Sequence, residues 1–159
     1  MKQQPATPAP EIKPSLPLQD QLCITLYSTT LAMNKLYRVA LKELDLTYPQ
    51  YLVMLVLWEQ DQRSVSAIGE ELFLDSATLT PLLKRMEKAE LVSRTRDPQD
   101  ERSVIIGLTA RGLALRAEAD QVLWKVICAA ELGAGEVREL RERLNGLRDR
   151  LFRNTEGLN

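Results

Sequence analysis

The residues whose chemistry stands out in this chain are a cysteine near the N-terminus and the tyrosines that follow it. On a helix that advances about 100° per residue, Cys23, Tyr27 and Tyr37 lie within about 40° of one line. Phenol hydroxyls near a thiol favour its thiolate form, and so does a position in the first turns of a helix. One helix face would therefore carry an oxidisable thiol and two phenols.

The spacing of these residues has a consequence for assembly. Tyr37 lies so far along the sequence from Cys23 that the rise of a helix would separate them by about 21 Å. One straight helix cannot bring Tyr37 to its own Cys23, whereas an antiparallel or crossed partner helix can, so a shared thiol site implies a dimer. The second cysteine, Cys128, lies in the apolar segment 124–128, where packing in a hydrophobic core would be enough to explain it.

The composition excludes several classes of enzyme. The chain contains no histidine, which rules out Ser-His-Asp and Cys-His catalysis and histidine metal sites. Two cysteines cannot form a four-thiolate zinc site within one chain, and the glycines lack the spacing of a phosphate-binding loop. We therefore expect a protein that is not an enzyme and that has no cofactor and no metal.

The lengths of the hydrophobic segments indicate the cellular compartment that we expect for the protein. No stretch approaches the roughly 20 apolar residues of a membrane span, and the N-terminus lacks the apolar core of a signal peptide. We expect a cytoplasmic protein without a membrane partner, in which a disulfide would be transient.

Basic residues are concentrated in one part of the chain. The net charge is -1, yet residues 76–111 carry +2, because they contain seven basic and five acidic residues. A helix predicted from Asp75 or Ser76 to about Ala89 would have apolar residues on one side: Leu79, Leu82, Leu83 and Met86. The other side and its flanks would hold small, hydroxyl-bearing and cationic residues: Ala77, Thr80, Pro81, Lys84, Arg85 and Lys88. Such a face suits entry into a DNA major groove.

Hydrophobic spacing predicts the elements that would position these residues. A Pro-rich tail, residues 1–16, is expected to stay disordered. Helices are predicted over 18–44, over 47–59 after a capping box at Thr47 and Gln50, and over 64–72 with Ser64 as the cap. Segments 91–96 and 103–108 alternate as two strands do. A helix from Thr109 to about Leu132 and another over 136–152 would follow, separated by Gly133 and Gly135.

Two short helices followed by a two-stranded hairpin form a winged helix-turn-helix. We expect a mainly α fold with a small β wing. A DNA-binding domain would occupy residues 47–109, and a helical dimerisation region would comprise residues 17–46 and 110–153. The second short helix would enter a major groove, and the wing, with Arg94, Arg96 and Arg102, would reach a minor groove.

Several segments resemble the MarR family, and more narrowly its organic-hydroperoxide-sensing branch, the OhrR repressors. The similar segments are 46–54, 72–76, 78–87, and the wing 97–103 with 108–109. The resemblance implies that Arg102 enters the minor groove and is oriented by Asp100. It also implies that five residues serve the major groove and its phosphates: Ser76, Thr78, Thr80, Lys84 and Arg85.

The same resemblance assigns the peroxide-reactive cysteine to Cys23. Its hydrogen-bonding tyrosines would be the partner subunit's Tyr37 and Tyr48, with Tyr27 nearby. Cys128 matches the resolving cysteine of the two-cysteine subgroup, which acts across the dimer. We therefore expect a homodimeric repressor on palindromic double-stranded DNA. Organic hydroperoxide would act as the inducer by oxidising Cys23 to a sulfenic acid.

Other functions remain open at this point. A MarR-type regulator would instead bind a small phenolic ligand between its domains, without redox chemistry. A thiol peroxidase would turn over peroxide, but the chain has no thioredoxin-like βαβ pattern and no Cys-x-x-Cys. A helical interaction protein without a DNA function would leave the wing arginines unexplained. Oxidation would end either at the Cys128 disulfide or at a mixed disulfide with a small thiol.

Overall fold

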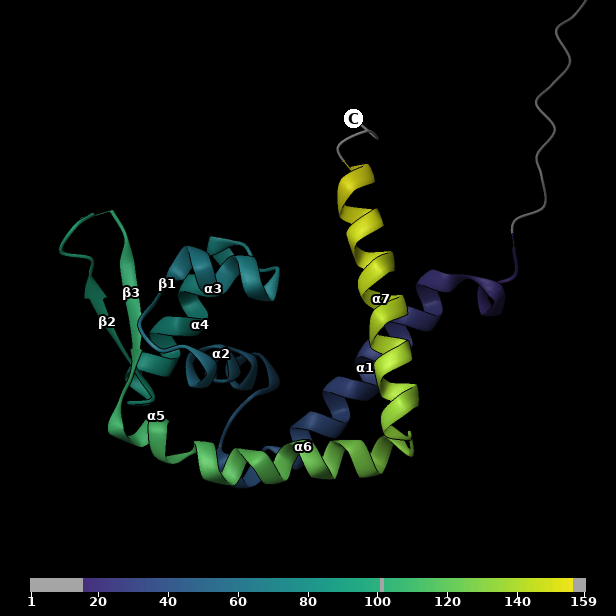
Figure 1. Cartoon of the computed structure of the whole chain (residues 1–159), viewed down its shortest axis with the longest axis horizontal. Coiled ribbons are helices and arrows are strands. Elements are labelled where there is room, and N and C mark those ends of the chain that lie inside the picture. The colour runs from purple at the N-terminus through teal and green to yellow at the C-terminus, as the bar shows by residue number, and fades with distance from the viewer. Residues whose placement is uncertain (1–15, 101, 156–159) are drawn as a thin grey trace, which may run out of the picture. The chain divides into compact units, whose positions relative to one another are not determined.

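The computed structural model describes residues 16–100 and 102–155, so most of the predicted N-terminal tail lies outside the described residues. The chain is mainly helical with one small antiparallel sheet, which confirms the predicted fold class (Figure 1). The described residues form two compact units that divide between Lys35 and Leu36, inside helix α1. None of the described helices is long and apolar enough to cross a membrane.

The first unit contains η1 (Leu18–Asp20) and most of α1 (Leu22–Ala40). The predicted continuous helix over 18–44 is too long at both ends. Gln21 adopts an extended backbone between η1 and α1, and the last part is a separate 3-10 turn, η2 (Lys42–Leu44). Asp45 ends this turn in the left-handed conformation with a φ of 51°. The tighter turn buries both Leu41 and Leu44.

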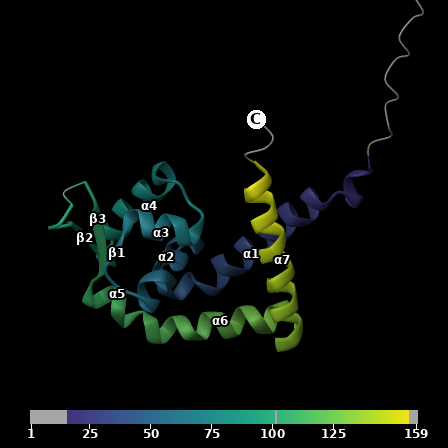
Figure 2. The ribbon, with the colours of Figure 1, turned by 45° about the horizontal axis from the view of Figure 1, so that its top comes forward.

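The core of the second unit is built around α2 (Tyr48–Glu59). The predicted capping box is present, with the Gln50 side chain accepting a hydrogen bond from the Thr47 N–H at 2.8 Å. Apolar side chains occur all round this helix, which predicts a central position. The prediction is confirmed, because α2 packs against α3, α4 and β3 (Figure 2). Its buried residues are Tyr51, Val53, Met54, Val56, Leu57 and Trp58.

Helices α3 (Val65–Leu72) and α4 (Ser76–Lys88) form the helix-turn-helix. Ser64 caps α3 by accepting from the Ala67 N–H at 3.1 Å, as predicted. Of the two residues proposed to cap α4, Asp75 is the one that does so, since its carboxylate accepts from the Thr78 N–H at 2.7 Å. This backbone hydrogen bond is the main reason that the pKa of Asp75 is lowered, so the cap weakens as the pH falls through that value.

The wing is a hairpin of β2 (Val92–Arg96) and β3 (Val104–Leu108), which confirms the two predicted strands. The strands pair antiparallel, with Val92 opposite Leu108 and Arg96 opposite Val104. A third strand, β1 (Arg63–Ser64), pairs with the other side of β3. The sequence analysis missed β1, because two residues are too few to show an alternating pattern.

Three helices follow the wing: α5 (Ala110–Ala114), α6 (Arg116–Ala130) and α7 (Ala134–Thr155). The single helix predicted after Thr109 is therefore interrupted at Leu115. It ends at Ala130, where Glu131 adopts a left-handed φ of 53°. Gly135 was expected to lie between two helices, but it lies inside α7. No described residue of α7 is buried within the single chain, and four of its leucine and valine side chains are exposed: Val137, Leu140, Leu144 and Leu151.

Gly112 lies where α5 meets the base of the wing. A Cβ atom at this position would overlap the carbonyl oxygen of Leu91. The Gly112 carbonyl in turn accepts a buried hydrogen bond of 2.9 Å from the Trp58 indole N–H. Both contacts involve backbone that cannot move aside easily, so the position requires glycine.

The substitution Gly112→Ala should lower the free energy of unfolding by about 1–3 kcal/mol, because the methyl group overpacks this junction. Urea unfolding followed by circular dichroism measures the change. The control is Gly135→Ala in α7, where a Cβ would meet nothing within 4 Å. That variant should be as stable as the wild type or slightly more so. Equal stability of Gly112→Ala and Gly135→Ala would contradict the close approach.

Candidate DNA interface and redox site

Helix α4 has two distinct faces, as its sequence predicts. Its four apolar residues are buried: Leu79, Leu82, Leu83 and Met86. Of the residues proposed to contact a major groove, Thr80 is half-buried and the others are exposed: Ser76, Thr78, Lys84 and Arg85. None of these side chains forms an ion pair with another described residue, so the two cations are available to phosphates.

The tip of the wing is organised by hydrogen bonds to the backbone. Asp97 donates its N–H to the Ser103 carbonyl at 3.0 Å, and Ser103 donates to the Asp100 carbonyl at 2.8 Å. The Asp100 carboxylate accepts from the Arg102 N–H at 3.1 Å. Asp100 therefore holds the backbone of Arg102 and leaves its exposed side chain directed to solvent.

The wing arginines do not have equivalent environments. Arg96 is exposed near the end of β2. The Arg94 side chain is only 21% exposed, and its guanidinium forms an ion pair with Glu87 of α4 at 3.4 Å. Its Nε atom is buried without a hydrogen-bond partner among the described residues. Arg94 therefore points toward the helix, although the sequence grouped it with Arg96 and Arg102.

Two of the predicted sensor residues lie together in the second unit. The Tyr37 and Tyr48 rings stack with centroids 4.1 Å apart and planes 17° apart. Turn η2 and the capping box at Thr47 bring the end of α1 and the start of α2 to this contact. Tyr51, which the sequence analysis did not select, lies beside them with its ring centroid 5.7 Å from that of Tyr37. The sequence could have indicated Tyr51, because it follows Tyr48 by about one helical turn and so lies on the same face of α2.

The environment of these phenols keeps them protonated. Burial, helped by the neighbouring Tyr48 and Tyr51, raises the pKa of Tyr37 to about 12. Burial also raises the pKa of Tyr48. For Tyr51, burial, the charge of Asp120 and the nearby Tyr48 all raise the pKa. Neutral phenols donate hydrogen bonds, so this cluster can stabilise an anion such as a thiolate.

Cys23 lies in the first unit as the second residue of α1, which matches the predicted position in the first turn. Its side chain is exposed, and the thiol donates to the Gln21 side-chain oxygen at 3.5 Å. Tyr27, one turn further along α1, is exposed as well. The Cys23 thiol is therefore accessible to a small oxidant in the single chain.

Cys128 lies in the last turn of α6 and is also a free, exposed thiol. The buried side chains of α6 are Ala119, Val122 and Val126, which face the rest of the unit. Packing within the single chain therefore does not account for Cys128.

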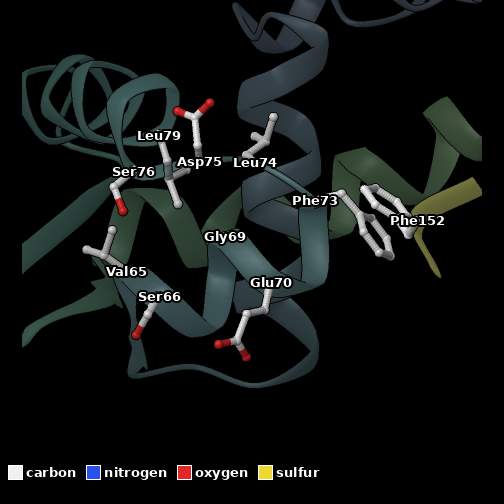
Figure 3. A pocket seen from close by; sticks show the side chains of 10 residues that line it. All are labelled: Val65, Ser66, Gly69, Glu70, Phe73, Leu74, Asp75, Ser76, Leu79 and Phe152. Carbon is white, nitrogen blue, oxygen red and sulfur yellow. The ribbon is translucent and has the colours of Figure 1, made fainter. Parts of the chain in front are cut away.

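A pocket of about 490 Å³ opens between α3, the start of α4 and the end of α7 (Figure 3). At one end Phe73 and Phe152 stack with ring centroids 5.5 Å apart. The charged residues of the lining are both acidic, Glu70 and Asp75, while the Arg148 guanidinium lies 4.4 Å from the centroid of the Phe73 ring.

Comparison with known proteins gives a consistent picture. The family model for the transcriptional regulator SarA/Rot matches residues 35–118. The chain is 41% identical over 134 residues to the organic hydroperoxide resistance transcriptional regulator of Bacillus subtilis, covering 84% of this chain and 91% of that protein. It is 46% identical over 134 residues to the HTH-type transcriptional regulator TtmR of Methylorubrum extorquens, covering 84% and 69%.

Solved structures include similar chains in different states. Reduced AbfR bound to DNA has 35% sequence identity and a TM-score of 0.70, and the match covers 84% of this chain and 93% of that one. Disulfide-formed AbfR has 36% identity and a TM-score of 0.60, covering 82% and 91%.

The geometry of the wing leads to a test of its role. Arg102→Ala should weaken binding to a specific DNA duplex by about 1–3 kcal/mol, since one groove contact is lost while the core is unchanged. Fluorescence anisotropy on a duplex selected by the wild-type protein from a random pool measures this. The comparison variant, Lys88→Ala at the end of α4, should mainly flatten the dependence of affinity on salt. If Arg102→Ala binds as tightly as the wild type, the wing is not part of the interface.

Proposed function

The chain belongs to the MarR family of transcriptional regulators, in its organic-hydroperoxide-sensing OhrR branch, and on that basis we propose that it is a homodimeric repressor that releases operator DNA when an organic hydroperoxide oxidises Cys23. The observation that carries the proposal is the stack of Tyr37 on Tyr48, because it creates a pair of protonated phenols that suits a thiolate. The redox states in which AbfR has been solved support a switch based on cysteine.

On DNA, α4 occupies the major groove and the wing reaches a neighbouring minor groove. The exposed Thr78, Lys84 and Arg85 supply hydrogen bonds and charge to the major groove and its phosphates, together with Ser76 and the half-buried Thr80. Arg96 and Arg102 extend the basic surface onto the wing, with Asp100 fixing the backbone beside Arg102. Two copies of this unit read the two halves of a palindrome.

Exposed apolar surface and helix geometry support the proposed dimer. Helix α7 leaves a stripe of apolar side chains exposed along its length: Val137, Leu140, Leu144 and Leu151. A second copy of the chain would bury this stripe. Cys23 and Tyr37 belong to one helix whose rise separates them by about 21 Å, so the phenols that serve each Cys23 come from the partner subunit.

The sensing step is a two-electron oxidation. The Cys23 thiolate attacks the terminal peroxide oxygen, a sulfur–oxygen bond forms, and the oxygen–oxygen bond breaks. The departing alkoxide takes a proton from water and leaves as an alcohol, while Cys23 becomes a sulfenic acid. The phenols of Tyr37 and Tyr48 stabilise the thiolate beforehand, and Tyr27 adds a hydroxyl on the same helix face as Cys23.

The sulfenic acid then condenses with the Cys128 thiol of the partner subunit. A disulfide forms and the hydroxyl group leaves as water, so the atoms and electrons balance without another oxidant. The exposure of Cys128 supports this role. The disulfide displaces the helices that carry the two winged domains and changes the spacing of the two α4 helices, which no longer fits the operator.

The alternative is a regulator released by a non-covalent phenolic ligand. The pocket between α3 and α7 is lined by apolar side chains and by Glu70 and Asp75, and Arg148 lies over the Phe73 ring at one end. A phenol is neutral at neutral pH, so these charges do not exclude it. The redox proposal has the stronger support because the chain is similar to a regulator of organic hydroperoxide resistance.

Cys23→Ser should bind the selected duplex with the affinity of the reduced wild type but should not release it when cumene hydroperoxide is added. The serine hydroxyl keeps the size of the side chain and cannot be oxidised in this way. Anisotropy with increasing peroxide distinguishes the two proteins. If Cys23→Ser releases DNA at the wild-type dose, Cys23 is not the sensor. Release of both proteins by a phenolic compound would favour the alternative.

Cys128→Ser should prevent the covalent dimer that peroxide produces in the wild type on a non-reducing gel. Cys23 should still form its sulfenic acid in this variant, detectable by dimedone labelling, and excess peroxide should drive it to the sulfinic acid. The double variant Cys23→Ser/Cys128→Ser has no thiol and is the negative control for dimedone labelling. A peroxide-induced dimer that persists in Cys128→Ser would mean that Cys23 pairs with its symmetry mate.

A further inference from the structure

The ion pair between Arg94 and Glu87 joins the two elements that reach DNA. Glu87 lies in the last turn of α4, and Arg94 lies in the middle of β2. Only the turn at Ala89–Leu91, with Glu90 at a φ of 57°, connects these elements along the chain. A contact between the side chains therefore adds a second link between the helix and the wing.

The register of the wing and the packing of α4 together explain why Arg94 points inward, whereas Arg96, on the same face at the end of β2, is exposed. Arg94 pairs with Ile106 across the hairpin, and residues directly opposite each other in an antiparallel sheet share a face. Ile106 is completely buried, so this face of the sheet is the one that covers the core. Helix α4 packs against β2, which places its last turn within reach of the Arg94 guanidinium.

Glu87 belongs to the face of α4 that the proposed function assigns to DNA. Thr80, Lys84 and Glu87 are spaced four and three residues apart, so they form one row along the helix. An unpaired carboxylate in this row would repel phosphates. Pairing with Arg94 neutralises it and directs it toward the wing.

We infer that Arg94 and Glu87 are positioning residues that set the wing relative to the α4 helix, and that Arg94 does not contact DNA itself. The inference rests on operator binding by the winged helix and is independent of peroxide sensing. An ion pair that fixes the wing relative to α4 matters for specific binding, in which helix and wing must enter their grooves together. It matters little for non-specific attraction to phosphates, which depends on the number of exposed cations.

The test uses the full-length reduced protein, a labelled duplex selected by the wild type, and a scrambled duplex of the same length. Glu87→Gln keeps the shape of the side chain and removes its charge. Arg94→Met keeps a long unbranched stem and removes the guanidinium. Each single variant should bind the selected duplex about five-fold more weakly, and the double variant should be no weaker than either one, because the two residues act through one contact.

Salt dependence separates positioning from direct contact. The slope of log affinity against log salt should be the same for Arg94→Met and the wild type, and affinity for the scrambled duplex should not change. Arg96→Gln, a variant at an exposed wing arginine, should reduce the slope by about 0.9, as expected for one lost phosphate contact. Glu139→Gln breaks an exposed ion pair with Arg143 on α7 and should bind both duplexes as the wild type does.

Several results would overturn the inference. Tighter binding by Glu87→Gln would show that this carboxylate only repels DNA. A reduced slope for Arg94→Met, or losses that add in the double variant, would make Arg94 a direct phosphate contact. Equal losses on the selected and scrambled duplexes would indicate damage to the fold. If the wild type shows no preference for any duplex, the proposed function fails together with this inference. In the other outcomes above, the wild type still prefers the selected duplex, and only the inference fails.

Discussion

The buried hydrogen bond from the Trp58 indole to the Gly112 carbonyl is the contact on which the rest of this structure depends. It joins the central helix α2 to α5, and residue 112 can approach so closely only because glycine has no side chain. The carbonyl of Leu91 at the same junction accepts from the Thr109 N–H and lies at the base of the wing. The central helix α2, the base of the wing and α5 therefore meet at one point.

Acidic side chains explain how a chain with a net charge of -1 presents a basic surface. Asp75 caps α4, Asp100 holds the backbone of Arg102, and Glu87 pairs with Arg94. Each of these carboxylates has a structural partner within the winged helix. The cations of α4 and the wing tip have no ion-pair partner among the described residues, so the local field is set by them: Lys84, Arg85, Lys88, Arg96 and Arg102.

The tyrosine cluster combines packing with chemistry. Burial of Tyr37, Tyr48 and Tyr51 raises the pKa of each phenol, which preserves its O–H as a donor. Tyr51 also packs edge-on against Trp58, with ring centroids 6.2 Å apart. The candidate sensor residues are therefore supported by the same core that holds the DNA-binding elements.

Local patterns were sufficient to predict much of this fold. The caps at Thr47 and Ser64, the two faces of α4 and the alternating strands of the wing depend on neighbours within a few residues, and all of them are found. The end of the first helix was less predictable, because burying Leu41 and Leu44 required a 3-10 turn that helical spacing alone does not indicate. The roles of Cys23, Asp100 and Arg102 were predicted from the resemblance to the MarR family, and they stay predictions.

By itself, the sequence determined that the chain folds mainly as helices with a small winged element. Only the tertiary structure decided which arginine faces outward. Arg94, Arg96 and Arg102 look alike in sequence, and Arg94 and Arg96 even share one face of β2, but only Arg94 lies within reach of the Glu87 carboxylate of α4. In the same way, only the meeting of the last turn of α1 with the start of α2 placed Tyr37 on Tyr48 and added Tyr51. Such contacts join residues from different elements, and local spacing carries no information about their distance or burial.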